Sequence, residues 1–181
     1  RQTRRSAGSC ESSDIVSALG SSILAFADGV PDPVAVKNGI TILTLQAVGV
    51  QIYECSAVGS VGAKWLLLEP LATLLKDGKT VGRHYAGPTW ELSLGEAIVG
   101  KVDGEKLGST SADVSQLRLQ VIGRSGGGPL IKADVVQRLN TYGGAFAGPC
   151  NAIGSFHLEP YSADYVFLRN ATKADHSPKL H

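Results

Sequence analysis

From Ile40 onward, short runs of β-branched, aromatic and aliphatic residues are separated by glycine, proline and asparagine. Apolar and polar residues alternate within these runs, which places successive side chains on opposite faces of a strand. The turn residues recur too often to leave room for long helices, and this pattern favours an antiparallel sheet over a parallel α/β sheet. The sequence therefore predicts an all-β domain, built as an antiparallel β-sandwich or barrel.

The expected strands follow the apolar runs. They span residues 40–55, 63–69, 71–75, 80–85, 89–92, 97–102, 116–122, 133–141 and 164–169. Gly49 is a candidate bulge in the long first run, and Pro70 is expected to end a strand because it has no N–H to donate. The dipeptide Asp77-Gly78 favours the positive φ angles of a tight hairpin turn.

The first 33 residues follow a different pattern and are expected to form a separate arm. After the potential capping residues Ser13 and Asp14, apolar residues recur at helical spacing, which predicts one short amphipathic helix. These residues are Ile15, Leu19, Ile23 and Phe26. Two prolines in segment 28–33 then interrupt regular structure. We therefore expect an N-terminal arm over 1–33, a β domain over 34–170 and a flexible C-terminal tail over 171–181.

Charge and hydropathy exclude two classes of partner. Seventeen basic residues against 16 acidic ones leave a formal net charge of +1, so no whole-domain field would hold nucleic acid. The longest apolar stretches, such as 40–50, are far shorter than the roughly 20 residues of a membrane-spanning helix. Methionine is absent, at position 1 as well, which indicates a start removed by processing or by design of the expressed chain. A secreted protein, extracellular or periplasmic, would account for this.

Five separated motifs resemble the signature of a known family. They are 49–55 (GVQIYEC), 82–91 (GRHYAGPTWE), 136–144 (VQRLNTYGG), 148–150 (GPC) and 160–167 (PYSADYVF). Together they resemble an uncharacterised family of exported bacterial and fungal proteins, catalogued as a domain of unknown function, over about residues 34–169. The resemblance implies a secreted, all-β domain with no established activity.

Some relatives in that family carry the label malate dehydrogenase. A dinucleotide-binding enzyme would need a GxGxxG turn between a strand and a helix. This sequence has no such turn, and its glycine-rich loop at 126–129 is no substitute. We therefore reject the label for this chain and expect no cofactor.

Three cysteines are present, and they are too widely spaced for a zinc-finger pattern and include no CxxC pair. One disulfide with one spare thiol is therefore expected. Bacterial relatives commonly keep only the two cysteines that match Cys55 and Cys150. The resemblance thus implies a disulfide between Cys55 and Cys150, with Cys10 to Cys150 as the alternative.

A candidate ligand site lies in the second motif, where His84, Tyr85, Trp90 and Glu91 occur within eight residues around a Gly-Pro pair. Alternation would place Tyr85 on the opposite face of the strand from His84, and the Gly-Pro turn would bring Trp90 back toward His84. A tryptophan ring with polar neighbours suits stacking against a sugar ring. The alternative is structural: the aromatic rings fill the core, His84 bonds a buried backbone group and the Gly-Pro pair forms a corner.

Other arrangements that carry chemistry have weaker signals. His84 and His157 could converge with Glu91 or Glu159, but no HxH or HExxH spacing supports this, and no metal site is assigned. No GxSxG turn marks a nucleophile, while a pair of carboxylates for glycoside cleavage stays open. In the last strand, Asp164 is expected to pair with Arg138 as a structural contact.

Three hypotheses follow for function. The favoured one is a secreted binding module for carbohydrate or another cell-envelope component, centred on residues 84–91. The first alternative is a hydrolytic or metal-assisted enzyme centred on His84 and Glu91. The second is a structural envelope protein that self-associates through the arm at 15–26, and the sequence leaves the oligomeric state open.

Overall fold

Eight antiparallel strands account for most of the chain. A computed structural model describes residues 29, 32–93 and 95–171. The strands are β1 (Gly39–Ala57), β2 (Ala63–Lys76), β3 (Lys79–Tyr85), β4 (Thr89–Leu92), β5 (Ala97–Lys106), β6 (Gln116–Ser125), β7 (Val135–Gly143) and β8 (Phe156–Asn170). Three short 3-10 turns are η1 (Asp32–Val34), η2 (Gly59–Val61) and η3 (Leu130–Lys132). The expected all-β, antiparallel class is confirmed, while the predicted arm helix and the tail from residue 172 lie outside the described residues.

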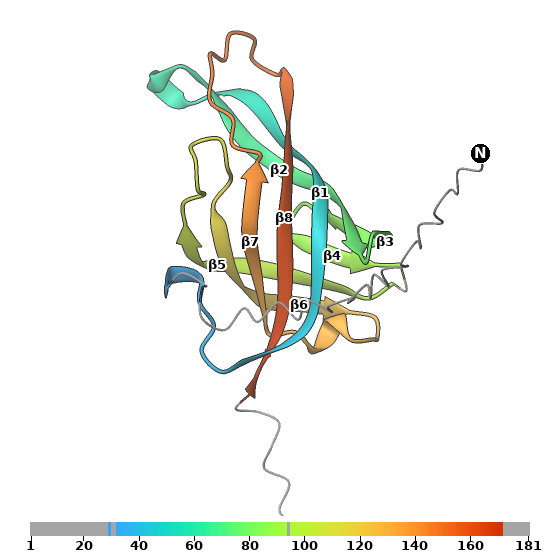
Figure 1. Ribbon diagram of the computed structural model, residues 1–181. Helices are drawn as coiled ribbons and strands as arrows, with labels where there is room; N and C mark the ends of the chain where they lie inside the picture. The colour runs from blue at the N-terminus through green and yellow to red at the C-terminus, as the bar shows by residue number, and fades with distance from the viewer. Residues whose placement is uncertain (1–28, 30–31, 94, 172–181) are drawn as a thin grey trace, which may run out of the picture.

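The strands pair in sequence order, and β8 pairs with β1 as well as with β7, so the sheet closes into a barrel (Figure 1). The connections β1–β2, β3–β4, β5–β6 and β7–β8 lie at one end, called the upper end here because it points upward in Figure 1. The β2–β3 connection at the lower end is the predicted hairpin turn. Asp77 and Gly78 have the required positive φ angles, 51° and 73°.

Apolar side chains fill the lower half of the barrel. The core contains Leu45, Leu74, Ile98 and Phe167, each from the lower part of its strand. Leu130 of η3 is fully buried in the same core, so the β6–β7 connection closes the lower end. No helix among the described residues has the length and hydrophobicity needed to cross a membrane.

The prediction that Pro70 ends a strand is wrong, because β2 runs through it. Strand β3 pairs with β2 only from Ala72 onward, so at Pro70 the strand has β1 on one side and a free edge on the other. Pro160 lies in the same situation on the other side of β1, since β7 pairs with β8 only from Tyr161 onward. Proline is tolerated where no neighbouring strand needs its N–H.

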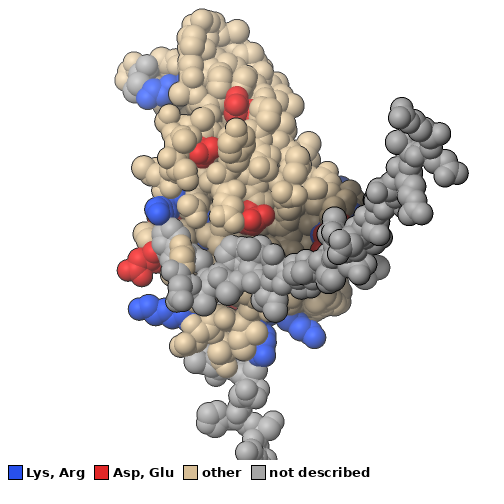
Figure 2. Space-filling model, viewed as in Figure 1, with Lys and Arg blue, Asp and Glu red and all other residues tan. Residues whose placement is uncertain are grey.

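The upper parts of β2, β1 and β8 therefore project beyond the barrel as a three-stranded ribbon with β1 in the centre (Figure 1). Its outer surface carries exposed apolar side chains, among them Leu66, Leu71, Phe156 and Leu158. Few charged side chains lie over the upper part of this face (Figure 2).

Gly49 is not the bulge that the sequence predicts. The register of β1 shifts between Ile52 and Tyr53 in its pairing with β2 and between Thr41 and Leu43 in its pairing with β8. At Gly49 the backbone of β2 crosses so closely that a Cβ atom would collide with the Leu71 carbonyl oxygen and with Ala72 Cα. Glycine is therefore needed here for the close approach of two strands, which is a common requirement where a barrel bends.

A disulfide fastens the β7–β8 connection to the ribbon. Cys55 on β1 is bonded to Cys150, with their Cα atoms 5.5 Å apart, which confirms the pairing implied by the family resemblance. Beside it, Trp65 Nε1 donates a hydrogen bond to the Pro149 carbonyl oxygen (3.1 Å), and the Trp65 ring packs edge-on against Phe146. A disulfide of this kind fits an extracellular or periplasmic protein.

Candidate functional site

The structure places the four predicted site residues on two faces of the β3–β4 hairpin. His84 and Trp90 are direct partners across the two strands, and both face the barrel interior, with 1% and 0% of their surface exposed. Tyr85 and Glu91 alternate with them and lie on the outer face. The structure therefore brings His84 and Trp90 together inside the barrel and Tyr85 and Glu91 together outside it, so the four do not line one cavity.

The outer pair belongs to a surface cluster whose members bond one another. Glu91 accepts a hydrogen bond of 2.7 Å from the Tyr85 hydroxyl and two from Arg83 Nη2, at 3.0 and 3.2 Å. The hydrogen bonds from Tyr85 and then Arg83 lower the pKa of the Glu91 carboxyl. A carboxylate held in this way is ionised and already partnered, which leaves it poorly suited to exchange protons with a substrate.

Inside the barrel, the His84 ring is neutral and holds a defined tautomer. Burial lowers its pKa to about 4. Its Nδ1 lies 2.8 Å from the Thr89 carbonyl oxygen, and because a carbonyl can only accept, Nδ1 carries the proton. Nε2 is then left as a hydrogen-bond acceptor. The backbone bond for His84 that the structural alternative expected is therefore present.

Trp90 is enclosed by other rings and does not form an open platform. His84 stacks on it, with ring centroids 4.7 Å apart and planes 13° apart. Tyr165 and Phe167 approach it edge-on, at 5.3 and 6.0 Å. Gly100 lies so close that a Cβ there would meet two carbon atoms of the indole ring. The indole therefore offers its N–H, rather than a ring face, to anything bound nearby.

Beside these rings, the upper half of the barrel contains a cavity of about 260 Å³. His84, Trp90, Tyr165 and Arg138 contribute polar or aromatic groups to its lining. Leu117, Leu119 and Val102, from β5 and β6, contribute apolar wall. The cavity is thus lined by both apolar and polar side chains, which is the usual composition of a small-molecule site.

Several buried polar side-chain atoms have no hydrogen-bond partner among the described residues, and three of their residues, Gln51, Trp90 and Tyr165, line the cavity. The atoms are Trp90 Nε1, the Tyr161 and Tyr165 hydroxyls, Thr141 Oγ1 and both side-chain polar atoms of Gln51. Burial raises the pKa of both tyrosines, so their hydroxyls stay protonated and can donate. Unpartnered buried polar atoms cost free energy and are uncommon in native proteins, so their clustering in one barrel interior needs an explanation.

Arg138 is the residue of this site that the sequence analysis misplaced. It lies on β7 opposite Tyr165 and lines the cavity, and its Nε donates to the Ser115 carbonyl oxygen (2.9 Å). The predicted pair with Asp164 is wrong, because Asp164 and Tyr165 alternate on β8 and therefore face opposite sides. Asp164 instead accepts a hydrogen bond from Asn140 Nδ2 (2.8 Å).

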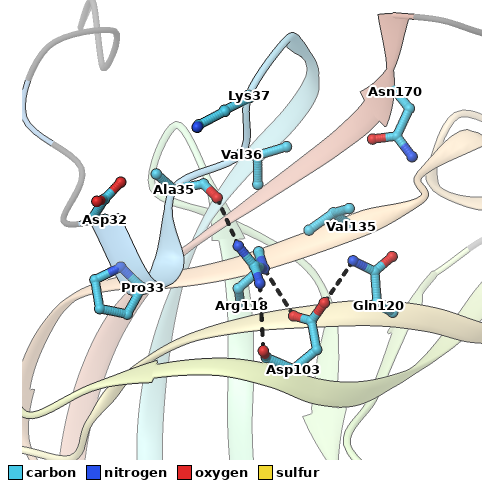
Figure 3. A pocket seen from close by; sticks show the side chains of 10 residues that line it. All are labelled: Asp32, Pro33, Ala35, Val36, Lys37, Asp103, Arg118, Gln120, Val135 and Asn170. Carbon is cyan, nitrogen blue, oxygen red and sulfur yellow. Dashed lines mark hydrogen bonds and ion pairs between the residues drawn. The ribbon is translucent and has the colours of Figure 1, made fainter.

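A second and larger cavity, of about 670 Å³, lies outside the barrel between the η1 segment and strands β5 to β8 (Figure 3). Its central Arg118 donates to Asp103 Oδ1 (2.9 Å) and to the Ala35 carbonyl oxygen (3.0 Å). Gln120 Nε2 donates to the other carboxylate oxygen of Asp103 (2.8 Å). The hydrogen-bonding groups of Arg118, Asp103 and Gln120 are thus bonded to one another, and Arg118 fastens the η1 segment to the barrel. Because the barrel cavity instead has buried polar atoms without partners among the described residues, we favour it as the binding site.

His157 lies away from the barrel cavity, in the aromatic group beside the disulfide. Its ring stacks on Phe146, with centroids 3.6 Å apart, and its Nε2 lies 2.7 Å from Glu159 Oε2. The possible convergence of His84 with His157 is therefore not seen. Within the described part of the chain, no three His, Cys, Asp or Glu side chains are grouped so that they could hold a metal ion.

Comparison with known proteins gives one match. The model of a family described as "Protein of unknown function (DUF3455)" matches residues 36–169, which is most of the chain and nearly the whole barrel. No curated protein and no solved structure matches the chain.

Proposed function

The chain belongs to the DUF3455 family of proteins of unknown function. For this member we propose a binding function, in which one small organic molecule is held in the upper half of the barrel. The observation that carries the proposal is that buried polar atoms of Trp90 and Gln51 have no hydrogen-bond partner among the described residues and that both residues line a cavity that also has apolar lining. A purely structural interior of this size would be expected to be apolar or fully hydrogen-bonded.

The shape of the cavity supports a small, amphipathic ligand. Its volume of about 260 Å³ is just below the roughly 300 Å³ at which typical small-molecule pockets begin. Apolar side chains on β5 and β6 would hold a hydrocarbon body, and the groups on β4, β7 and β8 would bond a polar end. Carbohydrate stays among the predicted ligands, although the covered faces of Trp90 favour hydrogen bonding over ring stacking.

We do not propose the enzyme centred on His84 and Glu91, because these side chains lie on opposite faces of the β3–β4 hairpin. Secretion stays part of the proposal, and the disulfide supports it. Self-association stays a separate prediction, with which the charge-poor outer surface of the ribbon is compatible (Figure 2).

The two tryptophans provide the test. In the ¹⁵N-labelled protein, each indole N–H gives its own nuclear magnetic resonance signal, and a Trp65→Phe variant assigns them. A panel of short-chain alcohols, carboxylates, phenols and monosaccharides is added in turn. A ligand in the cavity is expected to shift the Trp90 indole signal while the Trp65 signal, whose N–H is bonded to Pro149 outside the barrel, stays in place.

The matched variants are Leu117→Phe, which enlarges a cavity-lining side chain, and Ile122→Phe, which enlarges a side chain that is 63% exposed. The first is expected to abolish the Trp90 response and the second to leave it unchanged. Trp90→Ala is unsuitable, since removing a fully buried indole would cost about 3 to 5 kcal/mol of stability. A panel that never moves the Trp90 signal, or a response that survives Leu117→Phe, contradicts the proposal.

A further inference from the structure

The barrel interior contains a positive charge without a negative partner among the described residues. Arg83, Arg118 and Arg124 each lie within 3.2 Å of a carboxylate oxygen, from Glu91, Asp103 and Asp134 respectively. Arg138 makes no such pair; its Nε donates to the Ser115 carbonyl oxygen, and the Tyr165 hydroxyl lies beside its guanidinium. Arg169, near the end of β8, also has no carboxylate of the described residues within 4.0 Å, so what distinguishes Arg138 is that it is an unpaired arginine lining the cavity.

The histidine and the two tyrosines around Arg138 are neutral. His84 is uncharged because of its burial, with the Arg138 charge as a further cause that lowers its pKa. The Tyr161 and Tyr165 hydroxyls lie beside each other, and the Tyr165 hydroxyl lies beside Arg138, whose charge acts on the pKa of both tyrosines. Nothing on these three side chains balances the guanidinium.

Two carboxylates lie at the margin of the site. Glu69 on β2 is the acidic residue among those that line the cavity, but no basic nitrogen of the described residues lies within 4.0 Å of it. Glu159 is bonded to His157. The cavity therefore keeps an uncompensated cationic group, and a partly buried charge of this kind is costly unless something pairs with it.

We propose that the barrel cavity binds a small organic anion with an apolar body, such as a carboxylate, and that Arg138 binds its charged end. This proposal rests on the proposed function, that the cavity is a ligand site. The guanidinium presents its N–H groups in a planar fork that matches two oxygens of an oxyanion. The Tyr165 hydroxyl and the Trp90 N–H, from two further residues that line the cavity, can add neutral donors.

The apolar part of the ligand follows from the apolar side chains that line the cavity. They include Leu117 and Leu119 of β6 and Val102 of β5, and Leu117 is the direct cross-strand partner of Arg138. An inorganic anion would leave these apolar side chains without contacts, and an alcohol with a chain of similar length would leave the guanidinium unpaired. A molecule with an apolar body and an anionic end contacts the apolar side chains and pairs with the guanidinium, so we propose an organic anion rather than an inorganic anion or an alcohol.

The experiment compares three probes that share a six-carbon chain, namely hexanoate, hexanesulfonate and 1-hexanol, titrated at pH 7.5 and followed by the Trp90 indole signal. Both anions are expected to bind about tenfold more tightly than the alcohol, as for a charge-assisted bidentate contact. Arg138→Gln is expected to reduce anion affinity to that of the alcohol while leaving 1-hexanol binding unchanged, and Arg138→Lys to retain part of the preference. Arg83→Gln, which removes an arginine on the outer surface that is 64% exposed, should change none of these values.

The outcomes separate this inference from the proposed function. If anions and alcohol bind equally, or if Arg138→Gln leaves the anion preference intact, the anion proposal is overturned and the cavity is a site for neutral ligands. If none of the probes nor any member of the wider panel moves the Trp90 signal, the proposed function itself fails. If Arg138→Gln does not fold, the anion proposal is tested by the ratio of anion to alcohol affinity in the native protein and in Arg138→Lys. A ratio near one in the native protein, or an equal ratio in the two proteins, overturns it.

Discussion

At the scale of single residues, His84 links the chemistry of the site to the stability of the barrel. Its imidazole is fully enclosed between Trp90 and Tyr165, with ring centroids 4.7 and 4.9 Å away. A proton added to Nε2 would create a second positive charge beside Arg138 in a poorly solvated interior. The neutral ring is thus a condition for the native packing of the cavity.

This dependence predicts that acid destabilises the protein through His84. The folded pKa of about 4 lies below the ordinary value of 6.5, so the unfolded chain takes up the proton first as the pH falls. The stability contributed by the neutral ring is complete above about pH 6.5 and is lost as the pH falls through about 4, by up to about 3 kcal/mol. Urea unfolding at a series of pH values should show this slope, and the slope between pH 6.5 and 4.5 should be nearly absent in His84→Asn.

Other acid-sensitive groups do not disturb the comparison. Hydrogen bonds lower the pKa of Glu91 and Asp113 below their ordinary values of 4.5 and 3.8, so their contributions are also lost in acid. They are present in the native protein and in the variant alike, and they act mainly below pH 4.5. An unchanged slope in His84→Asn would show that the ring is not the group that titrates.

At the scale of residues, the sequence predicts that neighbouring side chains of a strand lie on opposite faces, but it does not predict which face is the barrel interior. The pattern around residue 84 places His84 and Tyr85 on opposite faces, as the structure has them. Which face is the interior depends on strands that are distant in the sequence, and so the four candidate residues could not be divided into an inner and an outer pair. The sequence also could not show that Arg138 and Asp164 do not pair, because this depends on the register between β7 and β8.

At the scale of elements, most strands lie where local pattern predicts them, and the errors occur where a neighbouring strand is absent. β4 has the predicted bounds, and the other strands differ from their predictions mainly in length. Pro70 is the instructive case. Proline ends a strand that is paired on both sides, but the upper part of β2 has a free edge, and no local signal reveals that edge.

The disulfide is expected to stabilise the barrel without being required to form it. It joins residues 95 positions apart, and closing a loop of that length restricts the unfolded chain enough to contribute about 4 to 5 kcal/mol. The double variant Cys55→Ala/Cys150→Ala should lose about this free energy of unfolding in denaturant titrations. Its Trp65 indole signal should move as the contact with Pro149 loosens, while the Trp90 signal stays.

Cys10→Ala is the matched control, because it removes a cysteine outside this bond. It should leave both the free energy of unfolding and the two indole signals unchanged. A double variant as stable as the native protein would mean that the bond does not restrict the unfolded chain. A moved Trp90 signal would instead show that the cavity depends on the tethered β7–β8 connection.

At the scale of the whole molecule, closure of the sheet is the property that local pattern predicts least. A sandwich and a barrel of these strands share turns, alternation and composition, and the sequence left the two open. What distinguishes them is the pairing of β1 with β8, which runs from Gly39 opposite Asn170 to Glu54 opposite Phe156. This contact joins the two ends of the domain, and it gives every strand a neighbour on both sides over at least part of its length.

Closure can be tested by a cross-link. Val48 and Ser162 are direct partners on β1 and β8, so cysteines at these positions, in a Cys10→Ser background, are expected to form an intramolecular disulfide on mild oxidation. In an open eight-stranded sheet of the same order, β1 and β8 would be about 34 Å apart at a spacing of ~4.8 Å per strand, and the bond could not form. The pair Val48→Cys/Ile122→Cys, which joins β1 to the non-adjacent β6, is the control and should stay reduced within the monomer. Mass spectrometry after proteolysis identifies the linked peptides. If the Val48→Cys/Ser162→Cys protein folds but forms no cross-link, β8 does not pair with β1. The interior would then be open along that side.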